Sequence, residues 1–147
     1  MAADHFVHLL QVSMPLQVAE TIADGALKAG AEAGLLPLTV AVLDVGGHLV
    51  VLKRQDGSGN FRADIAIGKA WTARAFDVET KALAKLAQPG DDFYGIHASN
   101  DGKVMIFAGG VPIKAGETVI GAVGVSGGTG KQDQGVAEAA AQAFARG

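Results

Sequence analysis

Apolar residues recur at helical spacing from Leu16 to Ala33 and then form an almost unbroken β-branched run from Leu38 to Val45. The first pattern is typical of an amphipathic helix that ends at Gly34, and the second of a central strand. After Gly46-Gly47 a second apolar run covers His48 to Lys53. Two glycines between two such runs predict a hairpin, because a two-residue turn needs positive φ.

The remaining pattern alternates helices and strands. A helix is expected from Phe61 to Phe76, apolar nearly all round and therefore covered on more than one side, and a shorter one from Asp77 to Ala87. Three further strands are expected at Val104–Ala108, Val111–Lys114 and Thr118–Ser126, followed by an alanine-rich helix to Phe144. This order predicts an α/β (α+β) fold in which helices pack on a single antiparallel five-stranded sheet.

Composition supports one domain over residues 1–147 and suggests association. The chain is 49% apolar but only 5% aromatic, so alanine and glycine supply much of the apolar count. Small side chains favour close packing of helices on sheets and of subunits on each other. The mean hydropathy of +0.28 is high for a monomer and predicts apolar surface buried between subunits in a homo-oligomer.

Charge and residue usage exclude several classes of function. The net charge is −3, so the basic footprint of a nucleic-acid-binding protein is absent. There is no cysteine, which excludes disulfides, thiolate catalysis and cysteine-ligated metals. The four histidines form no compact metal-ligand set, so no metal site is expected. Without a signal peptide or an apolar run of about 18 residues, we expect a cytoplasmic protein and no membrane partner.

A glycine-rich junction, Ser126-Gly127-Gly128, leads from the last strand directly into the last helix. Backbone N–H groups and the positive end of a helix dipole at such a junction favour an anion or a polar ligand edge. We therefore expect ligand contacts at Ser126, Gly127 and Gly128, and at Gly110 in the other glycine-rich strand end. The alternative is a tight turn closed by the capping box Thr129-Gly130-Lys131-Gln132. A P-loop is excluded, because Val125 and Gln132 stand where that motif needs Gly and Ser or Thr.

Three stretches, Val40–Gly57, Ala66–Phe76 and Gly109–Ala140, resemble the GlcG/HbpS-type family, which also supplies the C-terminal domain of PduO-type corrinoid adenosyltransferases. The resemblance implies a profilin-like fold and a homo-oligomer, often an octamer. It also implies a small-molecule-binding protein that functions in catabolism of small organic compounds, with haem as the cofactor of some members. Gln134 departs from the family, which usually has an acidic residue at that position.

Lys69 is the main candidate for chemistry. It shares a helical stripe with Ile65 and Thr72, and a lysine that faces the sheet has a lowered pKa and can act as a base or bind a carboxylate. With Asp56 or Asp133 as its acid–base partner, Lys69 defines the alternative function. That function is a cofactor-independent isomerase, tautomerase or lyase acting on a small organic acid or ketone. The structural alternative is an ion pair with one of four aspartates, Asp44, Asp56, Asp64 or Asp133, or a side chain that extends to water at a subunit boundary.

The remaining candidates are ligand-binding. Arg54 could hold a carboxylate, such as a haem propionate, bidentately. His97 lies near Tyr94 in an irregular segment, and a single histidine can suffice as an axial haem ligand. The segment could equally be a loop packed over the sheet edge. A third hypothesis is an accessory subunit of a larger enzyme.

Overall fold

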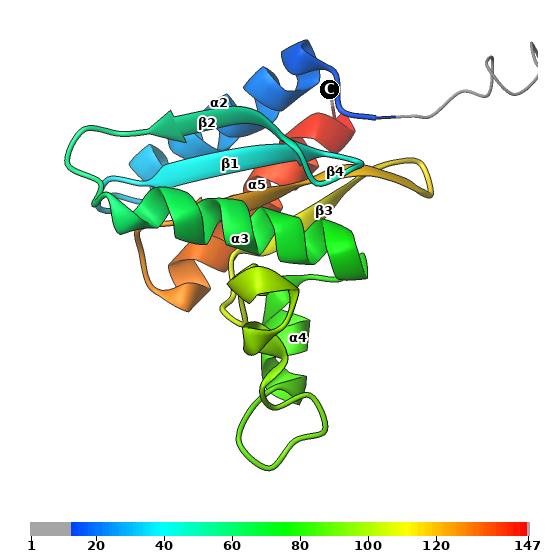
Figure 1. Ribbon diagram of the computed structural model, residues 1–147. Helices are drawn as coiled ribbons and strands as arrows, with labels where there is room; N and C mark the ends of the chain where they lie inside the picture. The colour runs from blue at the N-terminus through cyan, green and yellow to red at the C-terminus, as the bar shows by residue number, and fades with distance from the viewer. Residues whose placement is uncertain (1–12, 147) are drawn as a thin grey trace, which may run out of the picture.

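The computed structural model describes residues 13–146. Its centre is a four-stranded antiparallel sheet with the order β2-β1-β4-β3 (Figure 1). The strands are β1 (Thr39–Asp44), β2 (Leu49–Arg54), β3 (Gly110–Ala115) and β4 (Thr118–Ser126). The largely buried strands β1 and β4 lie in the middle, as their continuous apolar runs require.

Helices cover both faces of this sheet (Figure 1). On one face lie α2 (Leu16–Glu32) and α5 (Gly130–Arg146), and on the other lies α3 (Phe61–Phe76). The alternation of β1 sets this arrangement, because Val40 and Val42 belong to the core under α2 and α5, whereas Ala41 and Leu43 belong to the core under α3. The α+β architecture expected from the sequence is thus confirmed.

Below α3, an arm of the chain extends away from these layers (Figure 1). It begins with the short helix α4 (Thr80–Leu86) and continues through two single-turn 3₁₀ helices, η1 (Ile96–Ala98) and η2 (Asn100–Gly102). In η2 both Asn100 and Asp101 have positive φ, at 52° and 56°. Residues other than glycine adopt positive φ uncommonly. At these two residues the arm turns sharply back toward α3.

The prediction of five strands is wrong, because residues 104–108 form no strand. The segment follows α3 instead of pairing with the sheet. The Oγ1 of Thr72 accepts a hydrogen bond from the Met105 N–H at 2.9 Å and lies 3.3 Å from the Lys103 carbonyl oxygen. The Met105 side chain packs over Gly68, where a Cβ would lie 2.5 Å from its Cγ. Contact with a helix therefore replaces contact with a strand at Met105, whose N–H bonds to Thr72.

The predicted hairpin is confirmed, although its loop differs from the expected two-residue turn. Asp44 and His48 close the loop with a 2.9 Å bond from the Asp44 N–H to the His48 carbonyl. Of the two glycines, Gly47 has positive φ, at 81°, and Gly46 does not. A turn followed by one left-handed residue is the usual three-residue hairpin loop.

Two glycines allow α3 to lie directly on the sheet. A Cβ at Gly124 would overlap the Ala66 carbonyl oxygen, and a Cβ at Gly110 would overlap the Lys69 carbonyl oxygen. This close approach is what the small-residue composition predicts. It also brings the side chain of Lys69 to the end of β4. Among the described helices, none combines the length and the apolar character needed to cross a membrane.

Candidate functional site

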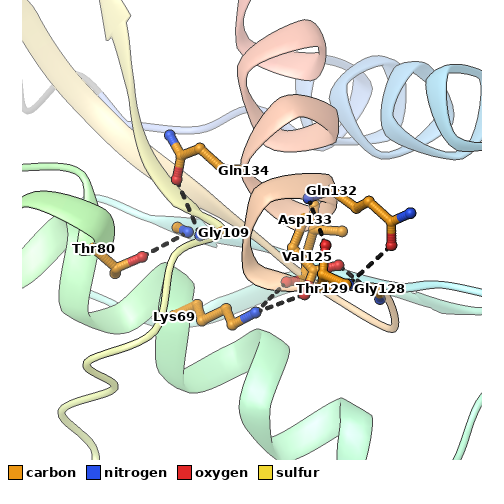
Figure 2. Close-up of polar contacts among 10 residues, drawn as sticks. Lys69, Thr80, Gly109, Val125, Gly128, Thr129, Gln132, Asp133 and Gln134 are labelled. Carbon is orange, nitrogen blue, oxygen red and sulfur yellow. Dashed lines mark hydrogen bonds and ion pairs between the residues drawn. The ribbon is translucent and has the colours of Figure 1, made fainter. Parts of the chain in front are cut away.

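Lys69 extends from α3 to the end of β4, where it meets the first turn of α5 (Figure 2). Its Nζ lies 2.9 Å from Asp133 Oδ2 and donates to the Val125 carbonyl oxygen at 2.8 Å. The two side chains are only 4% and 3% exposed. The structure therefore brings together two of the three residues predicted to be catalytic, and it joins them as a buried ion pair.

The second oxygen of Asp133 accepts a hydrogen bond from the Gly128 N–H at 2.8 Å. The capping box is also formed, since Thr129 N–H donates to Gln132 Oε1 at 2.9 Å and Gln132 N–H donates to Thr129 Oγ1 at 3.2 Å (Figure 2). At this junction the carboxylate of Asp133 therefore occupies the place of the external anion that the sequence predicted. The backbone donors there are largely satisfied by the chain itself.

Burial lowers the pKa of Lys69 below its usual value of 10.5, because taking the ammonium from water disfavours the charged form. The negative charge of Asp133 and its hydrogen bond act in the opposite direction, while the positive charge of Arg62 adds to the lowering. The lowered pKa agrees with the expectation from the helical stripe. None of the described cavities includes Lys69 or Asp133 in its lining.

Ser126 is fully buried, and its Oγ has no hydrogen-bond partner in the described part of the chain. Ser126 lies opposite Thr39 in the pairing of β1 with β4. The Thr39 hydroxyl is 2.7 Å from the Ser58 hydroxyl and is thus already paired. Because buried hydroxyls are normally satisfied, Ser126 is the exception in a junction that is otherwise closed.

Gly109 and Gly110 hold β3 against three helices. Gly109 N–H donates to Gln134 Oε1 at 3.0 Å, and Gly110 N–H donates to Thr80 Oγ1 at 2.9 Å. Gly109 has a φ of 124°, and a Cβ there would lie 2.9 Å from the Lys69 Nζ. Gly109 therefore packs directly over the ion pair, where a larger residue would not fit. Four of the predicted ligand contacts lie together at this junction: Gly110, Ser126, Gly127 and Gly128.

Arg54 and Asp56 lie apart from the ion pair, at the end of β2 and in the turn that follows it. Arg54 donates to Asn60 Oδ1 at 3.3 Å, and Asp56 is exposed. In residues 13–146, the carboxylate that Lys69 contacts is that of Asp133 and not that of Asp56.

Tyr94 and His97 form a second group, on the arm. Their rings are 6.3 Å apart between centroids in an edge-on arrangement. His97 lines a cavity of about 400 Å³, and the other side chains of this lining are apolar: Val104, Met105, Ile106 and Phe107. The segment at residues 104–108, which was predicted to be a strand, thus forms most of the wall of this cavity.

A neighbouring cavity of about 490 Å³ shares Gly102 and Met105 with the first. Its lining is more polar and includes Asp64 and Lys103 beside Trp71. The ammonium of Lys103 lies 5.6 Å from the centroid of the Trp71 ring. Sequence reasoning missed Lys103, Met105 and Trp71 as site residues. For Lys103 and Met105, the available signal was their position a few residues after His97. For Trp71, it was its position on a helix that is apolar nearly all round.

A family model described as haem degrading protein HbpS-like matches residues 14–142. The chain belongs to the HbpS-like family. A 15.0 kDa protein of Citrobacter freundii from the dhaT-dhaS intergenic region is 38% identical over 109 residues, which are 74% of this chain and 77% of that protein. Escherichia coli K12 GlcG is 35% identical over 89 residues, which are 60% of this chain and 63% of GlcG.

Other proteins extend this similarity. The corrinoid adenosyltransferase PduO of Citrobacter freundii is 34% identical over 74% of this chain, but the match spans only 32% of PduO. Klebsiella pneumoniae ORFY has a crystal structure with a TM-score of 0.88 and 35% identity, over 94% of this chain and 95% of that one. The structure of a PduOC–haem complex has a TM-score of 0.84 and 30% identity, over 90% of this chain and 95% of that one.

Proposed function

We propose that this HbpS-like protein binds haem, a planar apolar ligand with carboxylate groups, in the cavity that His97 lines on the arm. The observation that carries the proposal is an almost wholly apolar lining interrupted by one imidazole. Support also comes from the relative PduOC, whose structure is a haem complex, and from the description of the family as haem degrading. The activity of full-length PduO is not part of the proposal.

The residues present fit the group. Imidazole and thioether are side chains that ligate haem iron, and this lining contains one of each, from His97 and Met105. The volume of about 400 Å³ falls within the roughly 300–1,000 Å³ typical of small-molecule sites, and the adjoining cavity adds to it. Lys103, in the adjoining lining, supplies a cation for a propionate.

Two other cations of the described chain are already engaged. Lys53 is paired with Glu20 and Asp24 at 2.8 and 2.6 Å, and Arg74 donates to the Val45 carbonyl at 2.7 Å. This favours Lys103 over both as the propionate partner. When bound, haem supplies a redox-active iron. The chain's own residues exclude water through Val104, Ile106 and Phe107 and orient the ligand through His97 and Lys103.

The test is a haem titration of purified protein followed by the Soret band. We expect saturation at one haem per chain for the wild type, and at least tenfold weaker binding with a shifted band for His97→Ala. Lys85→Ala is the matched control, because Lys85 is also exposed on the arm but lies in neither of the two linings. Absence of saturable binding in the wild type would contradict the function. Equal affinity of wild type and His97→Ala would contradict the site alone.

We further propose that the protein works as a homo-oligomer in catabolism of small organic compounds, with the octamer of the resembled family as the expected size. Exposed apolar side chains such as Leu36, which is 75% exposed, and Leu16 support association. Light scattering after size exclusion gives the molar mass directly, and a monomer of 14.9 kDa at micromolar concentration would contradict it.

The proton-transfer alternative has less support. Lys69 and Asp133 neutralise each other in a buried pair, and the described cavities do not reach them. A general acid or base must come within hydrogen-bond reach of its substrate. The roles of Lys69, Asp56 and Asp133 in catalysis therefore stay predictions.

A further inference from the structure

A groove of about 450 Å³ runs between α2 and the beginning of α5, on the helix pair that covers the face of the sheet opposite α3. Aliphatic side chains form its walls: Ala29, Ala33, Leu35, Val136 and Ala139. None of these residues lines the haem cavity proposed above. The groove is therefore a separate feature, which the proposed function does not use.

Gly135 lies in the lining of this groove, within α5, and nothing in the fold requires a glycine there. Its φ is not positive, and a Cβ built on it would meet no atom within 4 Å. The helical glycines Gly30 and Gly68 differ, because a Cβ on either would lie 2.5 Å from a side chain of Leu38 or Met105. Glycine inside a helix destabilises it relative to alanine. A glycine at 135 thus lowers stability and keeps the groove open.

One charged side chain lines the groove. Lys131 is exposed, and within residues 13–146 it forms no ion pair. The other polar side chain in the lining, Gln132, is occupied by the capping box. The groove therefore combines an aliphatic surface with a single positive charge at the α5 side, and it contains no acidic residue.

We propose that this groove binds an alkyl carboxylate, with the hydrocarbon chain packed against the aliphatic walls and over Gly135, and the carboxylate paired with Lys131. Apolar area removed from water provides the affinity. The charge of Lys131 selects an acid over an amine or an alcohol of the same length. A volume of about 450 Å³ suits a small ligand.

Isothermal titration calorimetry with octanoate tests the proposal, with octylammonium and octan-1-ol as matched probes. We expect saturable octanoate binding at one site per chain, with octylammonium at least tenfold weaker. Lys131→Gln should weaken octanoate binding about two- to fivefold, as expected for an exposed charge contact, and should reduce the discrimination between acid and amine. Equal binding of the three probes, or no binding of octanoate, would overturn the proposal.

Substitutions at Gly135 separate the groove from the rest of the surface. Gly135→Leu should fill the groove and weaken octanoate binding more than tenfold, whereas Gln142→Leu, on an exposed part of α5 outside the lining, should bind normally. Gly135→Ala should raise Tm and still weaken octanoate binding, so stability and affinity move in opposite directions even if the leucine variant fails to fold. Unchanged affinity in Gly135→Ala and Gly135→Leu would contradict the site.

A second copy of the chain is the competing occupant, and sedimentation velocity distinguishes it. The groove is an interface between subunits, and the ligand proposal is wrong, if three results are found together. These are that the wild type associates, that Gly135→Leu abolishes the association, and that octanoate shows no saturable binding. If octanoate binds and the association state is the same in both proteins, the ligand proposal holds.

Discussion

The ammonium of Lys69 is a buried charge, and Asp133 is the residue that compensates it. Replacing Asp133 by asparagine keeps the shape of the side chain but removes the negative charge at 2.9 Å. Breaking one partner of a buried pair typically costs about 3–5 kcal/mol, because the remaining charge is left in a medium of low dielectric. We expect Asp133→Asn to lose unfolding free energy of that order in urea denaturation.

An exposed ion pair provides the control for this measurement. Asp77 accepts from Arg74 at 2.6 Å but is half exposed, so Asp77→Asn should lose less than about 1 kcal/mol. Adding Lys69→Met to Asp133→Asn removes the uncompensated charge and should restore part of the stability. An Asp133→Asn variant as stable as the wild type would mean that water or another carboxylate compensates Lys69.

The lowered pKa of Lys69 predicts a pH dependence whose sign is fixed. Between the folded pKa and the unfolded value of 10.5, the unfolded chain binds one proton more than the folded protein at this site. Stability contributed by this residue therefore rises with pH across that interval and is constant below it. The difference in unfolding free energy between wild type and Lys69→Met, measured from pH 8 upward, should change in favour of the wild type. A difference independent of pH would contradict the lowered pKa.

Gln134 joins two elements in a way that an acidic residue could not. Its Oε1 accepts from Gly109 and its Nε2 donates to Glu138 Oε1 at 2.9 Å. The hydrogen bond from Gln134 is the largest cause of a lowered pKa of Glu138, and the hydrogen bond from Lys81 is the next. The departure from the resembled family at this position therefore has a local reason, because a carboxylate at 134 would face that of Glu138.

We accordingly expect Gln134→Glu to destabilise the protein by about 1 kcal/mol at pH 7. The lowered pKa of Glu138 means that this residue contributes stability above its unfolded pKa, and that the contribution is lost as the pH falls through its folded pKa. The difference in unfolding free energy between Gln134→Glu and the wild type should therefore shrink on acidification. Guanidinium denaturation at pH 7 and pH 4 measures this, with Gln142→Glu on the same helix as control. A deficit that is equal at both pH values would exclude charge repulsion as the cause.

At the scale of elements, the contact of α3 with the sheet depends on glycine. A Cβ at Gly124 would meet the carbonyl oxygen of Ala66 and, at 2.7 Å, the nitrogen of Ala70. Because both neighbours are backbone atoms of a packed helix, they cannot yield as a side chain can. Gly124→Ala should therefore destabilise the fold by at least the roughly 1–3 kcal/mol typical of overpacking, measured by thermal unfolding. Gly135→Ala, with open space around it, is the control that should not destabilise.

The elements that the sequence predicted well are those whose local pattern had one solution. The helix at 16–33, the hairpin at Gly46-Gly47 and the capping box at Thr129 each follow from periodicity or turn chemistry, and all three form. The strand at 104–108 failed because a short apolar run does not reveal its partner. The Met105 N–H and the carbonyl of the preceding Lys103 bond to Thr72 on α3, a tertiary contact that no local pattern contains.

The same distinction holds for the candidate site. Lys69 was singled out from a helical stripe and the junction before α5 from a glycine-rich strand end, and the structure places these two features in contact. That Asp133 would fill the anion position could not be read from the sequence, since Asp44, Asp56 and Asp64 were equally eligible partners. The cavity beside His97 was hidden because its wall is the segment whose path was mispredicted.

For the whole molecule, the proposed haem site predicts where binding should change dynamics. In residues 13–146, the hydrogen bonds that join the cavity wall at 102–107 to α3 are those of Thr72, and a ligand that binds only the folded state stabilises the wall by mass action. Hydrogen exchange with saturating haem should slow most in residues 96–107, whereas amides of α2 that exchange by local opening should be unaffected. The haem-free protein and the His97→Ala variant with the same haem concentration are the controls. Protection confined to the groove between α2 and α5 would move the haem site to the other face of the sheet, because protection follows the surface that the ligand orders.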